Sequence, residues 1–119
     1  MKQIVAYIRP DKHFETRDAL EKAGFGAFHS ENVIGRGRQN SLYEFVNGGG
    51  QLPPGISGGQ MFAKKELTIV VNDQDVDAVV AELLAVNRTG VKGDGKIFVM
   101  PVVGAVRIRT GECGEDALL

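Results

Sequence analysis

The feature that most constrains the fold is a repeated order of elements: the pattern strand, helix, strand occurs twice, on either side of a glycine-rich stretch. Residues 3–8 are mostly apolar with β-branched members, and the run ends at Arg9-Pro10, which favours a buried strand. In residues 62–71, Leu67, Ile69 and Val71 occupy every second position, which is the period of a strand. Two halves of similar length therefore predict one sheet with two helical crossovers.

The helices are predicted between these strands. Residues 12–23 contain good helix formers, and Thr16 and Leu20 lie on one face of the expected helix. His13 is interpreted as a surface or boundary residue. Four apolar residues at spacings of three and four give the second helix its buried face: Val76, Val79, Val80 and Leu83.

Further strands are predicted at residues 25–34 and 96–102, with a short fifth strand at 105–108. The order β-α-β-β-α-β plus a short C-terminal strand is typical of an α+β, ferredoxin-like split βαβ fold with both helices on one face of the sheet. The other face of such a sheet is covered when subunits associate, so we expect an oligomer.

A single domain is expected over residues 1–119. Glycine and proline crowd into the middle of the chain and predict a long, mobile, exposed loop at about residues 37–62. Loops of this length in small domains are usually functional, which favours a recognition element. The acidic tail from about residue 111 is expected to be flexible.

The composition limits the kinds of partner and compartment. The formal net charge is −1, so no broad positive field attracts nucleic acid or an anionic membrane. Cys113 is the only cysteine, which excludes an intrachain disulfide and a four-thiolate metal site. The sequence contains neither a signal-peptide core nor a long apolar run, so we expect a cytoplasmic protein without membrane insertion.

A glycine-rich turn lies between the second helix and the fourth strand, at residues 88–95. Gly90, Gly93 and Gly95 can adopt positive φ and bring main-chain N–H groups close to an anion, to which Lys96 adds a positive charge. This pattern predicts a phosphate-binding cradle. Taken alone, these residues fit a tight connection with a solvated lysine even better.

Four separated segments of the chain form a specific combination in this order and at these separations. They are Gly35-Arg36-Gly37-Arg38-Gln39, Ala63-Lys64-Lys65, Thr89-Gly90-Val91-Lys92-Gly93-Asp94-Gly95-Lys96-Ile97-Phe98-Val99 and Val106-Arg107-Ile108-Arg109-Thr110-Gly111-Glu112. Together they resemble the PII signal-transduction proteins, which report the nitrogen and energy status of the cell. The similarity extends from Met1 to about Gly111 and excludes only the interior of the long loop.

The resemblance implies a homotrimer with three clefts between neighbouring subunits, each of which binds ATP or ADP competitively. Main-chain N–H groups of the glycine turn and the Lys96 ammonium would hold the phosphates, Arg107 and Arg109 would come from the adjacent subunit, and His29 would lie near the adenine. The implied nucleotide-binding residues are His29, Gly35, Gly37, Arg38, Gly93, Asp94, Gly95, Lys96, Arg107 and Arg109. On pattern alone, Arg107 and Arg109 fit a solvated strand face.

The resemblance also implies that 2-oxoglutarate binds when Mg-ATP is present. Mg²⁺ would bridge phosphate oxygens, the 2-oxo acid and the side-chain oxygen of Gln39. Lys64 would pair with the distal carboxylate of 2-oxoglutarate, and Lys65 takes its place if the register is shifted by one residue. Apart from the resemblance, the two lysines fit edge-strand charges that discourage aggregation.

The loop interior departs from many PII proteins. It does not reproduce the neighbourhood of their uridylylated tyrosine, so modification of Tyr43 is not implied. In its length and glycine content, the loop is similar to that of the PII branch whose members inhibit nitrogenase directly. In that branch, 2-oxoglutarate and ATP relieve the inhibition. Two PII-like chains can assemble together in that branch, so either a homotrimer or a mixed oligomer is expected.

Two other functional classes remain open at the level of sequence. One is a small ATP-hydrolysing enzyme that uses the same cradle, although no acid/base pair beside a nucleophile is evident. The other is a nucleotide-independent trimeric binding protein of the ferredoxin-like class. The expected function is a non-enzymatic sensor of ATP/ADP and 2-oxoglutarate that regulates a nitrogen-metabolism target, nitrogenase being the candidate.

Overall fold

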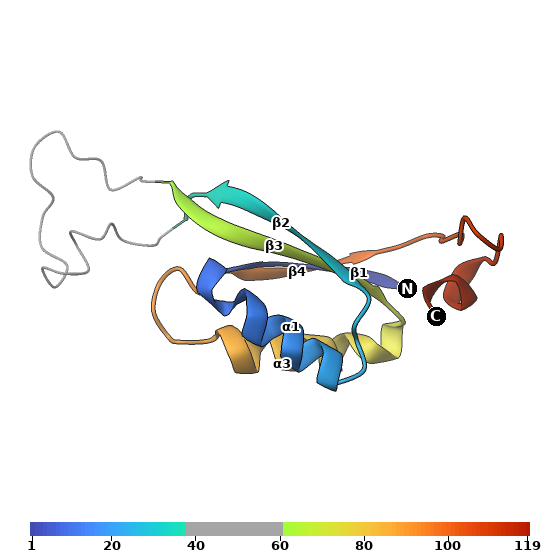
Figure 1. Cartoon of the computed structure of the whole chain (residues 1–119), viewed down its shortest axis with the longest axis horizontal. Helices are drawn as coiled ribbons and strands as arrows, with labels where there is room; N and C mark the ends of the chain where they lie inside the picture. The colour runs from blue at the N-terminus through green and yellow to red at the C-terminus, as the bar shows by residue number, and fades with distance from the viewer. Residues whose placement is uncertain (38–60) are drawn as a thin grey trace, which may run out of the picture.

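The computed structural model describes residues 1–37 and 61–119. Within these residues, the elements follow in the order strand, helix, strand, strand, helix, strand (Figure 1). Their bounds are β1 Lys2–Ile8, α1 His13–Lys22, β2 Phe28–Gly35, β3 Phe62–Val71, α3 Val76–Asn87 and β4 Lys96–Pro101. Short 3₁₀ helices are found at η1 Pro10–Lys12, η2 Asp73–Asp75 and η3 Gly114–Leu118.

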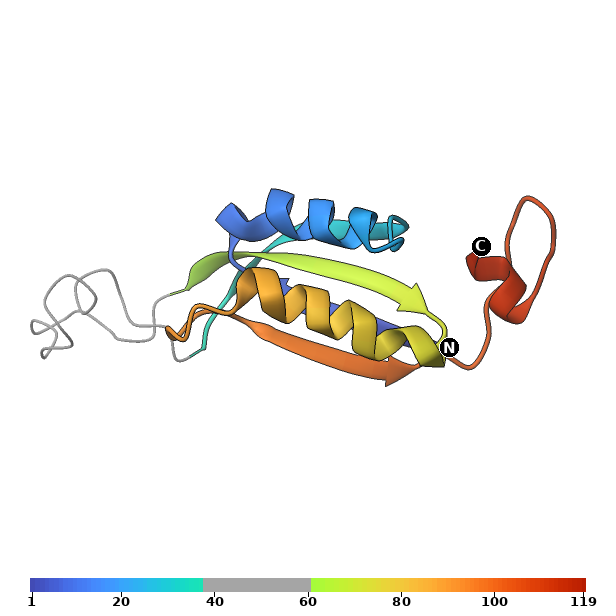
Figure 2. The same ribbon diagram turned by 90° about the horizontal axis from the view of Figure 1, so that it is seen from below.

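The strands form one sheet in the order β2-β3-β1-β4, and each neighbouring pair is antiparallel. Both helices pack on the same face of this sheet (Figures 1 and 2). This is the split βαβ arrangement, so the predicted α+β, ferredoxin-like fold class is confirmed.

The core lies between the sheet and the two helices. β1 and β3 are the central strands, and their side chains alternate between the two faces, so every second residue points toward the helices. Burying these apolar side chains supplies most of the favourable free energy of folding. The buried cluster consists of Ile4, Ala6, Ile8, Leu20, Leu67, Ile69, Val71, Val79 and Leu83.

A buried polar contact joins the two helices. Asn87 Nδ2 in α3 donates hydrogen bonds to Thr16 Oγ1 in α1 at 3.0 Å and to the Leu83 carbonyl oxygen at 2.9 Å. The Thr16 hydroxyl donates to the Lys12 carbonyl oxygen at 2.7 Å. Because a buried polar group without a partner is costly, this chain of bonds favours one position of α1 against α3.

No helix within residues 1–37 and 61–119 covers the opposite face of the sheet (Figures 1 and 2). Tyr7 of β1 and Phe98 of β4 lie on this face with their ring centroids 6.2 Å apart. Phe98 is 49% exposed, and Met100, two residues further along β4, is 40% exposed. We call Tyr7, Phe98 and Met100 the open sheet face; Phe98 and Met100 leave apolar surface available for a protein contact.

Several predicted bounds differ from the structure. The predicted strand at residues 105–108 is wrong: Val106 forms an isolated bridge with Cys113, and none of the sheet strands in the described part of the chain pairs with it. β2 starts at Phe28 rather than at residue 25. The tail expected to be flexible contains η3, and its mobility stays a prediction.

The predicted loop at about residues 37–62, including Tyr43, lies almost wholly outside the described residues. Residues 1–37 and 61–119 contain no helix with the length and apolar character needed to cross a membrane.

Candidate functional site

The glycine turn leads from the end of α3 into β4. Gly90, Gly93 and Gly95 have φ values of 84°, 105° and 107°, so the predicted positive φ at these three positions is confirmed. Gly95 also lies against the end of β1, where a Cβ atom would stand 1.6 Å from the carbonyl oxygen of Tyr7. Only glycine fits there, so the sequence and β1 together fix the shape of the turn.

The Asp94 carboxylate holds the turn together from inside. It accepts hydrogen bonds from the main-chain N–H groups of Thr89 at 2.8 Å and Gly90 at 2.9 Å, and from the Thr89 hydroxyl. Arg9, just after β1, forms an ion pair with the same carboxylate and donates to the Lys92 carbonyl oxygen at 3.0 Å. The turn is therefore attached to the end of β1.

These contacts keep Asp94 ionised. Burial opposes ionisation, but hydrogen bonds from Thr89, Arg9 and Gly90 outweigh it and hold the pKa of the Asp94 carboxyl far below its usual range. The Asp94 carboxylate therefore holds the shape of the turn. The main-chain N–H of Asp94, and not its side chain, is the candidate phosphate ligand.

Lys64 connects the turn with β3. Its ammonium donates to the Gly93 carbonyl oxygen at 2.8 Å. Burial lowers the pKa of Lys64, the positive charge of Arg9 lowers it further, and Asp94 opposes both. A bound carboxylate would offset the charge repulsion between Arg9 and Lys64.

Lys65 occupies a different place. It alternates with Lys64 along β3 and shares the helix-facing side with Leu67. Burial lowers the pKa of His13, and the positive charge of Lys65 lowers it further. His13 Nε2 lies 3.1 Å from Ser30 Oγ. Of the two lysines considered for the 2-oxo acid, Lys64 is the one at the glycine turn.

Lys96 and His29 lie at opposite edges of the sheet. Lys96 is exposed at the start of β4, opposite Tyr7 of β1, and its neighbour Ile97 packs against the core. His29 is exposed on β2, opposite Thr68 of β3. Because β3 and β1 separate these strands, one chain does not bring the two side chains together.

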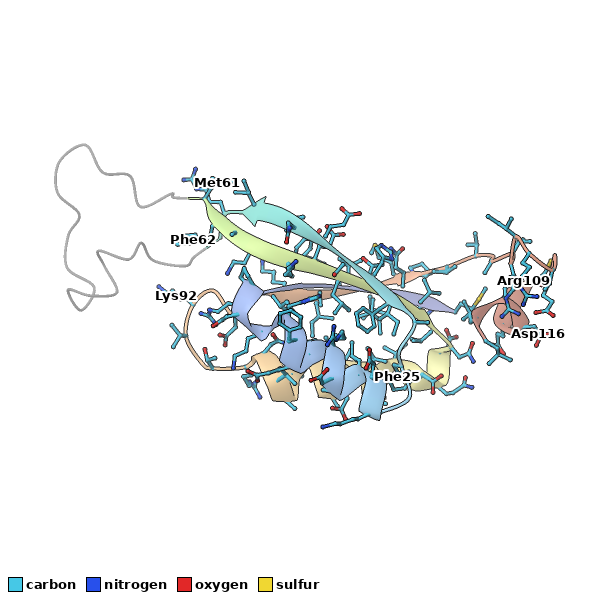
Figure 3. The ribbon with its side chains drawn as sticks, viewed as in Figure 1. Phe25, Met61, Phe62, Lys92, Arg109 and Asp116 are labelled. Atoms are coloured by element: carbon cyan, nitrogen blue, oxygen red, sulfur yellow. The ribbon has the colours of Figure 1, made fainter. Side chains whose placement is uncertain are left out.

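The end of β2 lies near the start of β3. Gly35 pairs with Phe62, and a Cβ at Gly35 would meet only the Lys64 side chain, at 3.8 Å. A Cβ at Gly37 would have open space around it. In Figure 3, Met61 and Phe62 are at the same end of the molecule as Lys92 of the glycine turn. Arg38 and Gln39, predicted for nucleotide and metal, lie outside the described residues.

The two predicted C-terminal arginines lie at the other end of the sheet. β4 runs from the glycine turn toward this end, and the segment that follows carries Arg109, which Figure 3 shows at the same end of the molecule as Asp116 and far from Lys92. Arg107 forms an ion pair with Glu112, with 2.7 Å between Nη1 and Oε2. Neither arginine can reach the glycine turn of its own chain.

Sequence reasoning missed Arg9. The signal was available in the predicted topology, because the end of β1 must lie beside the starts of its antiparallel neighbours β3 and β4. A cation after the first strand therefore meets the residues that precede the third and fourth strands.

The chain is similar to known proteins along nearly its whole length. Residues 1–112 match the family model described as nitrogen regulatory protein P-II. The protein named nitrogen fixation nifHD region GlnB-like protein 2 of Methanothermobacter marburgensis is 43% identical over 121 residues, covering 99% of this chain and 100% of that protein. The nifHD1 region GlnB-like protein 2 of Methanosarcina barkeri is 43% identical over 124 residues, with 99% of each chain covered. Nitrogen regulatory protein P-II 2 of Methanothermobacter thermautotrophicus is 44% identical over 118 residues, covering 99% of this chain and 97% of that protein.

Proposed function

Because the chain belongs to the nitrogen regulatory protein P-II family, we propose that it senses adenine nucleotides and 2-oxoglutarate and regulates a protein of nitrogen metabolism. The observation that supports this most is the meeting of the glycine turn, Lys64 and Arg9 at the end of the sheet where β2 ends and β3 begins. The nifHD-region names of several relatives favour nitrogenase as the regulated protein.

The nucleotide would lie in a cleft between two subunits. One subunit would contribute the main chain of Gly93, Asp94 and Gly95 together with the Lys96 ammonium, and the end of its β2 would contribute Gly35, Gly37 and Arg38. The neighbouring subunit would supply His29, Arg107 and Arg109. Support for the division comes from the single chain, in which the arginines are at the far end of the sheet from the glycine turn.

The open sheet face supports an oligomer. Phe98 and Met100 expose apolar surface on the face opposite α1 and α3, and packing this face against other subunits would remove that surface from water. We propose a trimer, either of this chain alone or mixed with a second PII-type chain.

The 2-oxoglutarate would bind beside the nucleotide. The contact of the Lys64 ammonium with the Gly93 carbonyl oxygen supports this proposal, in which Lys64 would pair with a carboxylate next to the phosphates. Mg²⁺ would take oxygen ligands from the phosphates, from the 2-oxo acid and from the Gln39 side chain. Since Lys64 and Gln39 lie on opposite sides of residues 40–63, a ligand held by both would favour one arrangement of that segment.

Titration calorimetry with ATP, with ADP and with 2-oxoglutarate tests this function, each ligand alone and in pairs with Mg²⁺. We expect ATP to tighten 2-oxoglutarate binding about 5- to 150-fold, and linkage requires the reverse effect to be equal. Independent affinities would rule out a shared site. Lys96→Ala should weaken ATP binding, while Lys92→Ala, an exposed lysine in the same turn, should leave it nearly unchanged.

The regulatory role is tested by adding the protein to purified nitrogenase. The assay contains Mg-ATP throughout, because nitrogenase consumes it. We expect the protein to reduce nitrogenase activity under these conditions and the activity to recover when 2-oxoglutarate is added. If activity is the same with and without the protein, nitrogenase is not the target, and the ligand-binding results stand separately.

A further inference from the structure

The structure gives the two C-terminal arginines different surroundings. Arg107 is enclosed by the segment that follows it, with both terminal nitrogens of its guanidinium group engaged. Arg109 is exposed, and within the described residues no ion pair or hydrogen bond holds its side chain. The family resemblance implies the same phosphate-binding role for both arginines. The difference in their surroundings comes from the tail of this chain, which contacts Arg107.

The contacts of Arg107 occupy the part of the side chain that would bind a phosphate. Nη1 donates to Glu112 Oε2 at 2.7 Å. Nη2 donates to the carbonyl oxygens of Asp116 at 3.2 Å and Ala117 at 3.4 Å, and also to that of Leu119. A guanidinium binds phosphate bidentately through two N–H groups of its planar fork. While the tail holds both terminal nitrogens, this mode is blocked.

The backbone of the tail positions these acceptors. The Arg107 N–H donates to the Glu112 carbonyl oxygen at 2.8 Å, and the Gly114 N–H donates to the Ala105 carbonyl oxygen at 2.9 Å. Gly111 and Gly114 have φ values of 74° and 67°, which let the chain fold back on itself. After the chain has folded back, the carbonyl groups of Asp116 and Ala117 in η3 point toward the Arg107 guanidinium.

We propose that Glu112 is an internal ligand of Arg107 that competes with the phosphates of a bound nucleotide. The tail must turn away from Arg107 before this guanidinium can reach a nucleotide held by the neighbouring glycine turn. Nucleotide affinity therefore includes the free energy of opening this contact, and Glu112 lowers the affinity. The inference rests on the proposed nucleotide site but concerns a residue outside it.

The test is a set of full-length variants titrated with ATP and Mg²⁺ in a calorimeter. Glu112→Gln removes the competing charge and should lower the Kd for ATP about two- to fivefold, the scale of an exposed ion pair. Glu115→Gln makes the same charge change in the same exposed segment and should leave the Kd unchanged. In an Arg107→Ala background, Glu112→Gln should have no effect.

The outcomes separate the two proposals. If wild-type protein binds ATP and Glu112→Gln does not tighten binding, the internal ligand is refuted and the sensor function stands. Equal tightening by Glu115→Gln, or tightening that persists without Arg107, also refutes it, because a general charge effect then explains the result. If Arg107→Ala binds too weakly to measure, the comparison between Glu112→Gln and Glu115→Gln decides. If wild-type protein binds no nucleotide, both proposals fall.

Discussion

At the scale of single residues, Gly95 determines how closely the glycine turn approaches the sheet. An alanine Cβ would overlap the Tyr7 carbonyl oxygen, and its φ of 107° is strained for any other residue. Gly90 offers a matched comparison, because its φ is 84° but nothing lies within 4 Å of its Cβ position.

We therefore expect Gly95→Ala to cost about 3 kcal/mol or more of unfolding free energy, and Gly90→Ala about 1–2 kcal/mol. Urea unfolding at one fixed protein concentration measures both values. Equal losses in the two variants would mean that contact with Tyr7 does not determine the shape of the turn.

The lowered pKa of Asp94 predicts that the stability of the protein depends on pH. Its pKa is lowered in the folded protein, so its contribution is present above the ordinary carboxyl pKa of about 4 and is lost as the pH falls below that value. Asp94→Asn should lower the unfolding free energy at pH 7 by about 1–3 kcal/mol, and the difference from wild type should shrink below about pH 4.

Melting temperatures recorded between pH 3 and pH 8 at fixed protein concentration measure this effect. Asp77→Asn, an exposed acid on α3, is the control and should follow the wild-type curve. A constant difference between Asp94→Asn and wild type down to the lowest pH would contradict the assignment of the acid-sensitive group.

At the scale of elements, β3 is joined to the glycine turn by the hydrogen bond from Lys64 to the Gly93 carbonyl oxygen. Lys64 and Lys65 are adjacent on this strand but face opposite sides of the sheet, one toward Gly93 and the other toward the helices. Adjacent lysines therefore make a matched pair of variants, because both changes remove one positive charge from the same strand.

Lys64→Ala should abolish most 2-oxoglutarate binding measured in the presence of Mg-ATP, whereas Lys65→Ala should change it less than about threefold. Calorimetry gives both affinities, and melting curves confirm that each variant is folded. The opposite ranking would assign the distal carboxylate to Lys65.

The elements themselves were largely predictable. The bounds of β3 were predicted correctly because alternation of Leu67, Ile69 and Val71 is a local signal that tertiary contacts reinforce. The strand predicted at 105–108 was wrong because alternation of side chains also suits a segment that folds back on itself. A strand requires a partner, and the partner is a tertiary property.

At the scale of the whole molecule, the proposed trimer depends on the open sheet face. Phe98 is 49% exposed on this face, whereas Phe14 is 65% exposed on the helical side. Placing a charge in an interface between subunits costs far more than placing it on a solvated helix.

Phe98→Glu should therefore convert the proposed trimer to smaller species, and Phe14→Glu should leave the molar mass unchanged. Light scattering coupled to size-exclusion chromatography measures both. A Phe98→Glu protein that keeps the molar mass of the wild type would place the interface elsewhere.

The sequence by itself determined the order of the helices and sheet strands, the alternation of Leu67, Ile69 and Val71 in β3, and the positive φ of the glycine turn, because these follow from local periodicity and from the properties of glycine. Only the tertiary structure decided that Arg9 pairs with Asp94, which is 85 positions away in the chain, and that Glu112 holds Arg107 while Arg109 stays exposed. A charged side chain is compatible with many partners along a sequence, and the choice among them depends on how the strands are ordered and on where the tail folds back.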